Sequence, residues 1–340
     1  MSSASSPLLD FRDVSRSFTV RQGVLGRVRG EVSAVDGVSL SVRRGETLGL
    51  VGESGCGKST LARMAVRLLP PTGGEILFDG ESVLPGVSGR NDTWYSRRLQ
   101  MIFQDPFSSL NPRLRIGTSI AEPLMAIGTP SAERQERVGE ILRRVGLQPG
   151  HAGRYPHEFS GGQRQRVALA RSLADKPGLL LMDEPLSNLD AKLKIEMRKE
   201  ISRIHRETHS SILYVTHDQS EAMGMADRIV IMKDGVVQQI GTPKEIFSNP
   251  ANPFVAQFVG QTNLIPGKWQ DDCFICGKGE VIRNRHVPHS FHKADCYPVK
   301  PEQVNLVEAG QSGLLATVES TEYQGFRSKI LLALEDHTVI

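Results

Sequence analysis

The sequence predicts an α/β domain with a parallel sheet at its centre, followed by a small all-β module. Three observations predict this fold class. A glycine-rich loop at residues 52–60 lies between an apolar strand and a predicted helix at 61–69. Residues 179–184 form an apolar strand that ends in two carboxylates, and wholly apolar strands suit the buried centre of a parallel sheet. From residue 262 onward, short strands alternate with turns, which indicates an all-β part.

Length and composition exclude several classes of protein. A chain of 340 residues suggests about two domains. Its net charge of +3 is too small to indicate a nucleic-acid partner. No run of about 18 apolar residues predicts a membrane span, and the first residues lack a secretory pattern, so a cytoplasmic location is favoured. Four cysteines in a chain of this length do not make a disulfide framework.

Two strands precede the glycine-rich loop and one follows its helix. Residues 8–20 interleave apolar and polar side chains, and residues 38–42 alternate strictly. Residues 75–80 are predicted to form a hairpin strand that ends in a turn. These strands place the loop within a continuous strand-rich region.

The glycine-rich loop fits the phosphate-binding pattern G-x-x-x-x-G-K-[ST]. Its candidate binding residues are Gly52, Glu53, Ser54, Gly55, Cys56, Gly57, Lys58, Ser59 and Thr60. Glycines let the backbone approach phosphate oxygens, and the following helix directs its N–H groups at the anion. Lys58 is expected to contact the β- and γ-phosphates, and the Ser59 hydroxyl to ligate Mg²⁺.

More specific hypotheses concern Cys56, inside this loop, and Phe18, in the first predicted strand. Cys56 lies at a helix N-terminus, where a thiolate is favoured, so its alkylation is expected to block activity unless ATP protects it. Phe18 is either a core aromatic or a flat platform on which adenine stacks, and its sequence context favours neither interpretation.

Polar side chains stand at the ends of three further strands. Gln104 ends the strand at 101–106 and could reach Mg²⁺ and the attacking water, although a solvent-facing loop glutamine is the alternative. Asp183 is placed to hold Mg²⁺ through water, and Glu184 to polarise a hydrolytic water. His217 ends the strand at 211–218 and is a candidate contact for the γ-phosphate. Since ligands of open α/β sheets bind at the carboxyl ends of strands, these positions are expected to converge on the phosphate loop.

A mostly helical region, about residues 93–174, interrupts the strands and is predicted to be an inserted subdomain. Its helix at 131–145 is expected to be capped by Ser131 and ended by Gly146. A second candidate anion site precedes the helix at 167–174 and consists of Ser160, Gly161, Gly162 and Gln163. One chain does not need two γ-phosphate sites. A head-to-tail dimer would let this loop close on ATP held by the partner.

This ordered set of motifs resembles the nucleotide-binding subunit of an ABC transporter, over about residues 8–260. The motifs are the phosphate loop, Gln104, Phe159-Ser160-Gly161-Gly162-Gln163, Asp183-Glu184, Asp190 and His217. The resemblance implies a P-loop NTPase fold with a helical subdomain in residues 8–256, and an Mg²⁺-dependent ATPase that works as a dimer. One departure is Phe159, where many members carry leucine.

The resemblance also implies a role for each matching residue. Phe18 would stack on adenine, and Glu184 would be the general base. Gln104 would bind Mg²⁺ and take part in coupling hydrolysis to transport. Ser160 to Gln163 would contact the partner's γ-phosphate, Asp190 would communicate across the dimer, and His217 would contact the γ-phosphate. ATP and Mg²⁺ are the expected ligands.

The resemblance favours an importer subunit on the cytoplasmic face of the membrane. Such a subunit would form a dimer with a second copy of itself or with another ABC ATPase. It would bind transmembrane permease subunits and depend indirectly on an extracytoplasmic solute-binding protein. Residues 24–27 and 104–112 resemble oligopeptide, dipeptide and nickel importers, whereas 184–193 and 239–246 resemble sugar, polyamine and iron importers. The cargo is therefore not assigned. An exporter ATPase and a soluble ABC ATPase acting on ribosomes or DNA remain the alternatives.

Residues 257–340 are expected to form the all-β module. Residues 299–303 and the strands after them resemble the TOBE domain, a small OB-like barrel appended to many importer ATPases. The module also holds residue types that bind zinc: Cys273, Cys276, His286, His289, His292 and Cys296. Their spacing matches no closed zinc site, so they are interpreted as core and surface residues, with a metal or redox sensor as the alternative.

Overall fold

The computed structural model describes residues 6–22, 27–84, 86, 92–104, 110–271, 273–276, 280–283, 287–307, 314–323, 325 and 328–334. The chain divides into two compact units, residues 1–243 and 244–340. The division falls before the boundary at 256/257 expected from the sequence, so that two short helices join the second unit: α9 (Pro243–Ser248) and α10 (Pro253–Gly260).

A six-stranded sheet lies at the centre of the first unit, in the order β10-β9-β3-β8-β7-β6. All neighbours are parallel except β10 and β9. Its strands are β3 (Thr47–Gly52), β6 (Leu99–Ile102), β7 (Leu179–Asp183), β8 (Ser211–Thr216), β9 (Arg228–Lys233) and β10 (Val236–Gly241). Every residue of β3, β7 and β8 is buried, which confirms the predicted parallel sheet.

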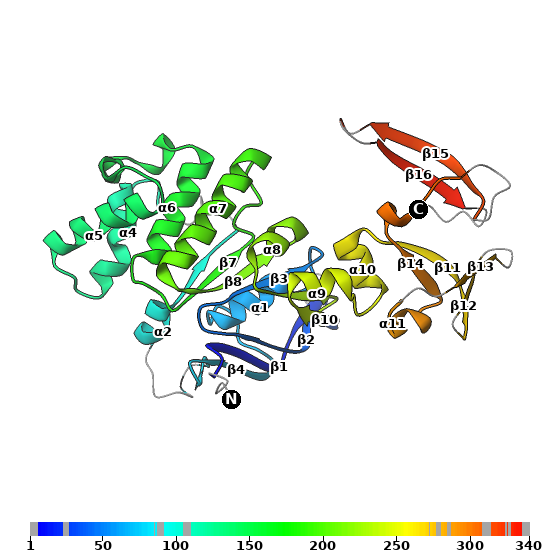
Figure 1. Cartoon of the computed structure of the whole chain (residues 1–340). Coiled ribbons are helices and arrows are strands. Elements are labelled where there is room, and N and C mark those ends of the chain that lie inside the picture. The colour runs from blue at the N-terminus through cyan, green and yellow to red at the C-terminus, as the bar shows by residue number, and fades with distance from the viewer. Residues whose placement is uncertain are drawn as a thin grey trace, which may run out of the picture. The chain divides into compact units, whose positions relative to one another are not determined.

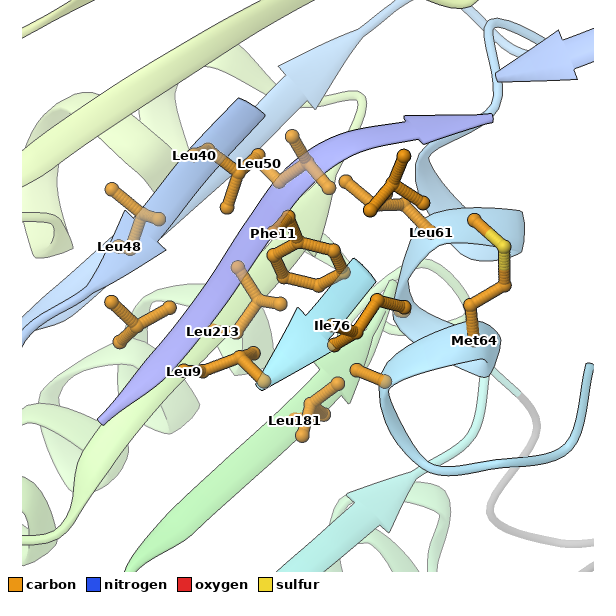
Figure 2. Close-up of a cluster of buried hydrophobic side chains, with 14 of the residues drawn as sticks. Leu9, Phe11, Leu40, Leu48, Leu50, Leu61, Met64, Ile76, Leu181 and Leu213 are labelled. Atoms are coloured by element: carbon orange, nitrogen blue, oxygen red, sulfur yellow. The ribbon is translucent and has the colours of Figure 1, made fainter. Parts of the chain in front are cut away.

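A second, antiparallel sheet has the order β2-β1-β4-β5. Its strands are β1 (Leu9–Gln22), β2 (Arg27–Val42), β4 (Gly73–Phe78) and β5 (Glu81–Ser82). Strand β2 begins well before the predicted 38–42, because it pairs with β1 along most of its length. Phe11 and Ile76 from this sheet meet Leu50 and Leu213 from the parallel sheet in one core (Figure 2).

The helices of the first unit follow the predicted order, with shifted ends. They are α1 (Lys58–Ala65), α2 (Asp92–Arg98), α4 (Ile116–Ala126), α5 (Ser131–Arg144), α6 (Gly161–Leu173), α7 (Ala191–Thr208) and α8 (Gln219–Met225), with 3-10 turns at Pro149–Gly153 and Pro156–Glu158. Helices α4, α5 and α6 gather beside one another between β6 and β7 in the chain (Figure 1). They form the predicted helical insertion, although the expected range of 93–174 also includes β6, which belongs to the parallel sheet.

The ends of α5 test two sequence expectations. The expectation that Ser131 caps this helix is wrong, because Pro130 holds the cap position and no side chain caps it. Gly146 ends the helix as predicted: its φ is +71° and its N–H donates to the carbonyl of Arg143 at 3.0 Å.

The second unit is built mainly from antiparallel strands. Beyond α9 and α10 it contains β11 (Asn263–Gln270), β12 (Cys273–Cys276), β13 (Glu280–Arg283), α11 (His289–His292), β14 (Cys296–Val299), a 3-10 turn at Pro301–Gln303, β15 (Ala316–Tyr323) and β16 (Ser328–Leu334). Four strands form a sheet in the order β13-β12-β11-β14, and β15 pairs with β16. These strands agree with the predicted small β module.

Cys276 and His292 of this unit make ordinary packing contacts. The Cys276 thiol contacts the carbonyl of Glu280 at 3.5 Å, and the His292 ring stacks on Trp269 at 4.0 Å. Burial raises the pKa of the Cys296 thiol. His286 and the side chain of His289 lie outside the described part of the chain, and within that part no group of three His, Cys, Asp or Glu side chains is arranged to hold a metal ion. In the described part of the chain, no helix combines the length and the apolar character that crossing a membrane requires.

Candidate phosphate-binding site at the edge of the parallel sheet

The glycine-rich loop connects β3 to α1 and has a backbone that only glycine tolerates at two points. Gly57 has a φ of +99°, and a Cβ there would lie 2.1 Å from the carbonyl oxygen of Ala34. A Cβ on Gly52 would lie 2.3 Å from the carbonyl oxygen of Met232. The left-handed Gly57 caps α1, so this helix begins at Lys58 rather than at the predicted residue 61.

Lys58 projects its ammonium into the loop that precedes it. Its Nζ donates to the carbonyl oxygens of Gly52 at 2.9 Å and Glu53 at 2.7 Å, and only 3% of the residue is exposed. The loop therefore surrounds a positive charge whose present acceptors are neutral carbonyls. Phosphate oxygens are stronger acceptors for such a donor, because hydrogen bonds to ionised groups are stronger.

Cys56 does not fit the thiolate predicted from its position. The side chain is buried, with 5% of the residue exposed, and burial raises the pKa of the thiol despite the attraction of the nearby Lys58 ammonium. Its Sγ lies 3.7 Å from the Lys58 Nζ. The expectation of a favoured thiolate is wrong, because desolvation penalises the charged form more than the helix N-terminus and Lys58 favour it.

Ser59 and Asp183 form a pair of oxygen ligands between α1 and β7. The Ser59 Oγ donates to the Asp183 Oδ1 at 2.7 Å, and Asp183 is 1% exposed. Burial raises the pKa of the Asp183 carboxyl, because the charged form loses its hydration. A buried carboxylate beside a hydroxyl is the kind of hard oxygen set that Mg²⁺ prefers, so the two residues fit this ion.

Glu184 follows β7 in a strained backbone conformation that directs its side chain across the sheet edge. Its φ is +45°, in the left-handed region that non-glycine residues rarely adopt. Two contacts hold this conformation: the Glu184 N–H donates to the carbonyl of Val215 at 2.9 Å, and the Ser187 hydroxyl donates to the Glu184 carbonyl at 3.0 Å.

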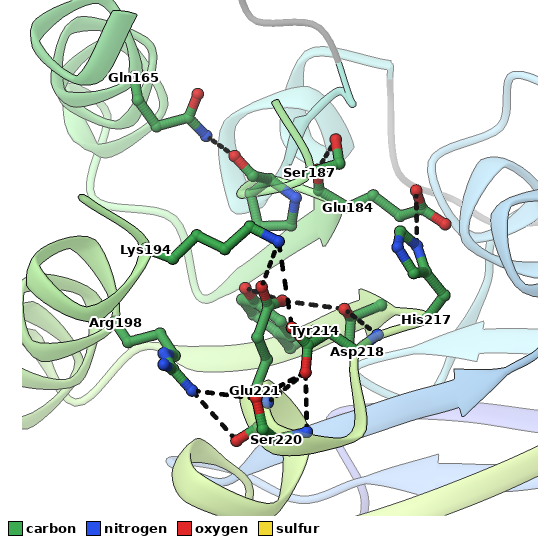
Figure 3. A network of polar contacts seen from close by, with 12 residues as sticks. Gln165, Glu184, Ser187, Lys194, Arg198, Tyr214, His217, Asp218, Ser220 and Glu221 are labelled. Atoms are coloured by element: carbon green, nitrogen blue, oxygen red, sulfur yellow. Dashed lines mark hydrogen bonds and ion pairs between the residues drawn. The ribbon is translucent and has the colours of Figure 1, made fainter. Parts of the chain in front are cut away.

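The Glu184 carboxylate meets two of the other candidate residues. Its Oε2 accepts a hydrogen bond from the Gln104 Nε2 at 2.9 Å. The same atom lies 3.1 Å from the His217 Nδ1 (Figure 3). The side chain of Glu184 is 12% exposed and that of His217 is 45% exposed. An amide, a carboxylate and an imidazole therefore converge where water has access.

The structure brings together the strand-end residues that the sequence places there. Strands β3, β8, β7 and β6 are consecutive neighbours in the sheet. The phosphate loop, His217, the Asp183-Glu184 pair and Gln104 follow these four strands in that order. The arrangement combines a cationic phosphate cradle, a candidate metal pair and a candidate base on one edge.

The Ser160 loop is organised by contacts within itself. The Gln163 N–H donates to the Ser160 Oγ at 3.4 Å, and the Ser160 N–H donates to the Gln163 Oε1 at 3.1 Å. Ser160 and Gly161 are exposed, and a Cβ on Gly161 would meet nothing closer than Leu189 at 4.0 Å. Phe159, the departure from the leucine common in the family, is buried with its ring edge on His151.

Asp190 and Phe18 lie outside the cluster of strand ends. Asp190 caps α7, since its Oδ1 accepts from the N–H of Leu193 at 3.0 Å. Phe18 is 38% exposed and is not a core aromatic. The Arg16 guanidinium lies 4.7 Å from its ring centroid and donates to the Pro70 carbonyl at 2.9 Å, so the ring has a fixed support.

Sequence reasoning missed the residues that hold these groups in place. Ser187 fixes the Glu184 carbonyl, and the Gln165 amide donates to the Pro185 carbonyl, tying α6 to the turn after Glu184 (Figure 3). Glu221 is 2% exposed and contacts Thr216, the neighbour of His217. The sequence gives no signal for Glu221 beyond its place four residues after His217, since its burial against β8 is seen only in the structure.

Comparison with known proteins identifies relatives over most of the chain. A protein-family model described as "ABC transporter" matches residues 35–187. The oligopeptide transport ATP-binding protein OppF of Bacillus subtilis is 44% identical over 270 residues, which cover 76% of this chain and 88% of that protein. The spermidine/putrescine import ATP-binding protein PotA of Rubrobacter xylanophilus is 37% identical over 336 residues, covering 96% and 86% of the two chains. The sn-glycerol-3-phosphate import ATP-binding protein UgpC 1 of Rhizobium johnstonii is 45% identical over 303 residues, covering 87% and 79%.

Solved structures give the same result at the level of the fold. The protein cbiO1 of Clostridium perfringens, described as part of the ABC transporter complex cbiONQ, has a TM-score of 0.62 at 28% identity, over 72% of this chain and 91% of that chain. The ATP-binding cassette MJ0796, in a dimeric post-hydrolysis state bound to ADP and Pi, has a TM-score of 0.59 at 28% identity, over 69% of this chain and 98% of that chain.

Proposed function

The chain belongs to the ABC transporter family, and from this premise we propose that it is the ATP-hydrolysing subunit of a solute importer. The observation that carries the proposal is the convergence of Lys58, the Ser59–Asp183 pair and the Gln104–Glu184–His217 cluster on one edge of the parallel sheet. The import ATP-binding proteins among its relatives support the direction of transport.

Lys58 binds the β- and γ-phosphates of ATP in this proposal, together with the backbone N–H groups of its loop. Ser59, Asp183 and Gln104 would hold Mg²⁺, which supplies charge neutralisation of the phosphates when bound. Phe18, held from one side by Arg16, offers its ring to the adenine base. These contacts bind and orient the nucleotide before any bond is broken.

Hydrolysis begins at Glu184. Its carboxylate accepts a proton from a water molecule whose oxygen bonds to the γ-phosphorus, while the bond from that phosphorus to the β–γ bridging oxygen breaks and ADP leaves. The left-handed backbone at Glu184 fixes where the carboxylate lies. Gln104 orients Glu184 and the water through the 2.9 Å hydrogen bond, and His217 contacts the γ-phosphate. The Oε2 atom of Glu184 contacts both Gln104 and His217, so a shift of either side chain would move the general base.

A second ABC ATPase chain completes each site. The Ser160 loop is exposed, and the monomer leaves open space around Gly161, so the fold of one chain does not explain why glycine stands there. A phosphate approaching from a partner would need that space, together with the Ser160 hydroxyl and the N-terminus of α6. Asp190, at the start of α7, is the proposed contact across the dimer.

Permease subunits in the membrane are the proposed partners of the helical insertion. A groove of about 380 Å³ lies between this insertion and β6. Its lining includes Gln100, Met101, Phe103, Glu122, Arg171 and Asp175. Phe103 is 38% exposed and directly precedes Gln104, so a segment bound in the groove would be next to the hydrolytic cluster. The chain would thus lie peripherally on the cytoplasmic face of the membrane, with an extracytoplasmic binding protein acting on it only through the permease.

The second unit is proposed to be a TOBE-like module that regulates or stabilises the importer. Its four-stranded sheet and separate β15–β16 hairpin support a small β domain. The relatives include oligopeptide, polyamine and glycerol-phosphate systems, so the cargo is proposed to belong to one of these classes or to the sugars and iron that the sequence motifs also suggest.

Transport assays test the proposal and its cargo together. The chain is co-expressed with its membrane subunits and binding protein, reconstituted in vesicles, and assayed for ATP hydrolysis with oligopeptides, polyamines, sugars, glycerol phosphate and ferric iron. We expect one class to stimulate hydrolysis, because importers couple turnover to the loaded binding protein. A high rate that no class changes would favour an exporter, and failure to co-purify with membrane proteins would favour a soluble ABC ATPase.

A further inference from the structure

We propose that Glu221 is a positioning residue for His217, acting through the hydroxyl of Thr216. The inference rests on the proposed ATPase function, and it assigns a role to a buried carboxylate that contacts neither the phosphate loop nor Glu184. Glu221 lies in the first turn of α8 and is 2% exposed, immediately behind the strand end that carries His217.

Glu221 accepts two hydrogen bonds from the end of β8. Its Oε2 accepts from the Thr216 Oγ1 at 2.9 Å and from the Tyr214 hydroxyl at 3.0 Å (Figure 3). Both donors are buried. One carboxylate oxygen therefore holds two side chains on alternate residues of the same strand.

The Thr216 hydroxyl connects Glu221 to the backbone on the far side of His217. The Asp218 N–H donates to the Thr216 Oγ1 at 3.0 Å. A hydroxyl has a single hydrogen, and the carboxylate of Glu221 accepts it, so the lone pairs of Oγ1 are left to face the Asp218 N–H. The bond fixes the chain on both sides of His217, whose Nδ1 then lies 3.1 Å from the Glu184 Oε2.

One charged group of α7, the ammonium of Lys194, faces the buried carboxylate, and Arg198 of the same helix holds the residue before Glu221. The Lys194 Nζ lies 3.9 Å from the Glu221 Oε1 and 4.0 Å from the Asp218 Oδ2. The Arg198 Nη1 donates to the Ser220 carbonyl at 3.3 Å. Asp190 caps α7. The residue proposed to contact the partner and the segment that carries His217 are therefore linked through this helix and the Glu221 carboxylate.

A purely structural role for Glu221 predicts a different pattern of effects. If Glu221 only satisfies buried hydroxyls, removing either donor should lower stability to a similar extent and leave hydrolysis unchanged. If it positions His217, only the bond to Thr216 matters for hydrolysis. Tyr214 and Thr216 therefore provide matched controls on the same oxygen atom.

The test compares Glu221→Leu, Thr216→Val, Thr216→Ser and Tyr214→Phe in the full chain, because leucine, unlike glutamine, has no oxygen that accepts the hydroxyl hydrogens. We expect Glu221→Leu and Thr216→Val to lower kcat for ATP roughly tenfold with the dissociation constant for ATP within about twofold of wild type, since the hydrogen bond between residues 221 and 216 is lost. Thr216→Ser keeps the hydroxyl and should retain the rate, and Tyr214→Phe should also retain it. Equal losses in Thr216→Val and Tyr214→Phe would overturn the proposal.

A double-mutant cycle with His217→Ala decides whether the effect passes through His217. We expect Glu221→Leu to add less than about a twofold loss in the His217→Ala background, because the group that Glu221 positions is already absent. Multiplicative losses would show that Glu221 acts elsewhere.

Hydrogen exchange provides a readout that needs no activity. Without the Glu221 carboxylate, the Asp218 amide should exchange roughly tenfold faster, as after loss of one hydrogen bond, and it should stay protected in Tyr214→Phe. Unchanged protection in both Glu221→Leu and Thr216→Val would overturn the positioning role. A wild-type chain that binds no ATP and hydrolyses none would instead refute the proposed ATPase function, and the exchange result would still decide this inference.

Discussion

We expect the Glu184→Gln variant to bind ATP with wild-type affinity and to hydrolyse it at least about 100-fold more slowly, which is the smallest contribution usual for a general base. Glutamine has the shape of glutamate, and its amide oxygen still accepts the hydrogen bond from Gln104, so the cluster at the strand end should keep its geometry. Only the ability to take a proton from water is lost. ATP should therefore accumulate in a closed dimer, which phosphate release and light scattering detect together.

A matched substitution controls for the loss of one negative charge. Glu196 is an exposed carboxylate on α7, and Glu196→Gln should leave the hydrolysis rate unchanged. Unaltered turnover in Glu184→Gln would mean that another group accepts the proton, and the assignment of Glu184 as general base would have to be withdrawn.

Lys58→Ala should weaken ATP binding roughly 100-fold, because two or more charge-assisted hydrogen bonds to phosphate are lost. Lys58 is 3% exposed, and the carbonyls of Gly52 and Glu53 direct its ammonium into the loop. Titration with a fluorescent ATP analogue measures the change. Hydrolysis should fall with it at nucleotide concentrations below the new dissociation constant.

Loss of affinity must be separated from loss of folding, since Lys58 is buried. Lys58→Met fills nearly the same volume without the charge and should show the same affinity loss with wild-type thermal unfolding. Lys199→Ala removes an exposed lysine of α7 and should change neither property. Tight ATP binding by a folded Lys58→Met chain would place the phosphates elsewhere.

The phosphate site could be predicted because the residues that form it are close together in the sequence. The glycines at 52 and 57, the lysine and the strand before them lie within a few residues of one another. The convergence of Asp183, Glu184 and His217 was also predictable, because each follows an apolar strand and parallel strands end at a common edge.

Features that depend on burial or on distant residues could not be predicted. The position of Cys56 suggested a thiolate, but desolvation by surrounding core side chains decides its pKa. The backbone of Glu184 is held by Val215 on the next strand, and Glu221 meets Thr216 only after α8 folds back on β8. The start of β2 was missed for the same reason, since pairing with β1 extends a strand that has weak alternation of its own.

The central claim is that each ATP site is made from two chains, and mixing two inactive variants tests it most directly. Lys58→Ala removes the phosphate loop's charge, and Gly161→Asp places a carboxylate in the exposed Ser160 loop, where the monomer has room for it. Each variant alone should be nearly inactive. Mixed in equal amounts, they form heterodimers with one intact site, and roughly a quarter of the wild-type rate should return, as expected for random pairing of a two-fold dimer. A mixture that stays as inactive as its components at every ratio, or a Gly161→Asp chain that hydrolyses ATP at the wild-type rate alone, would contradict the account.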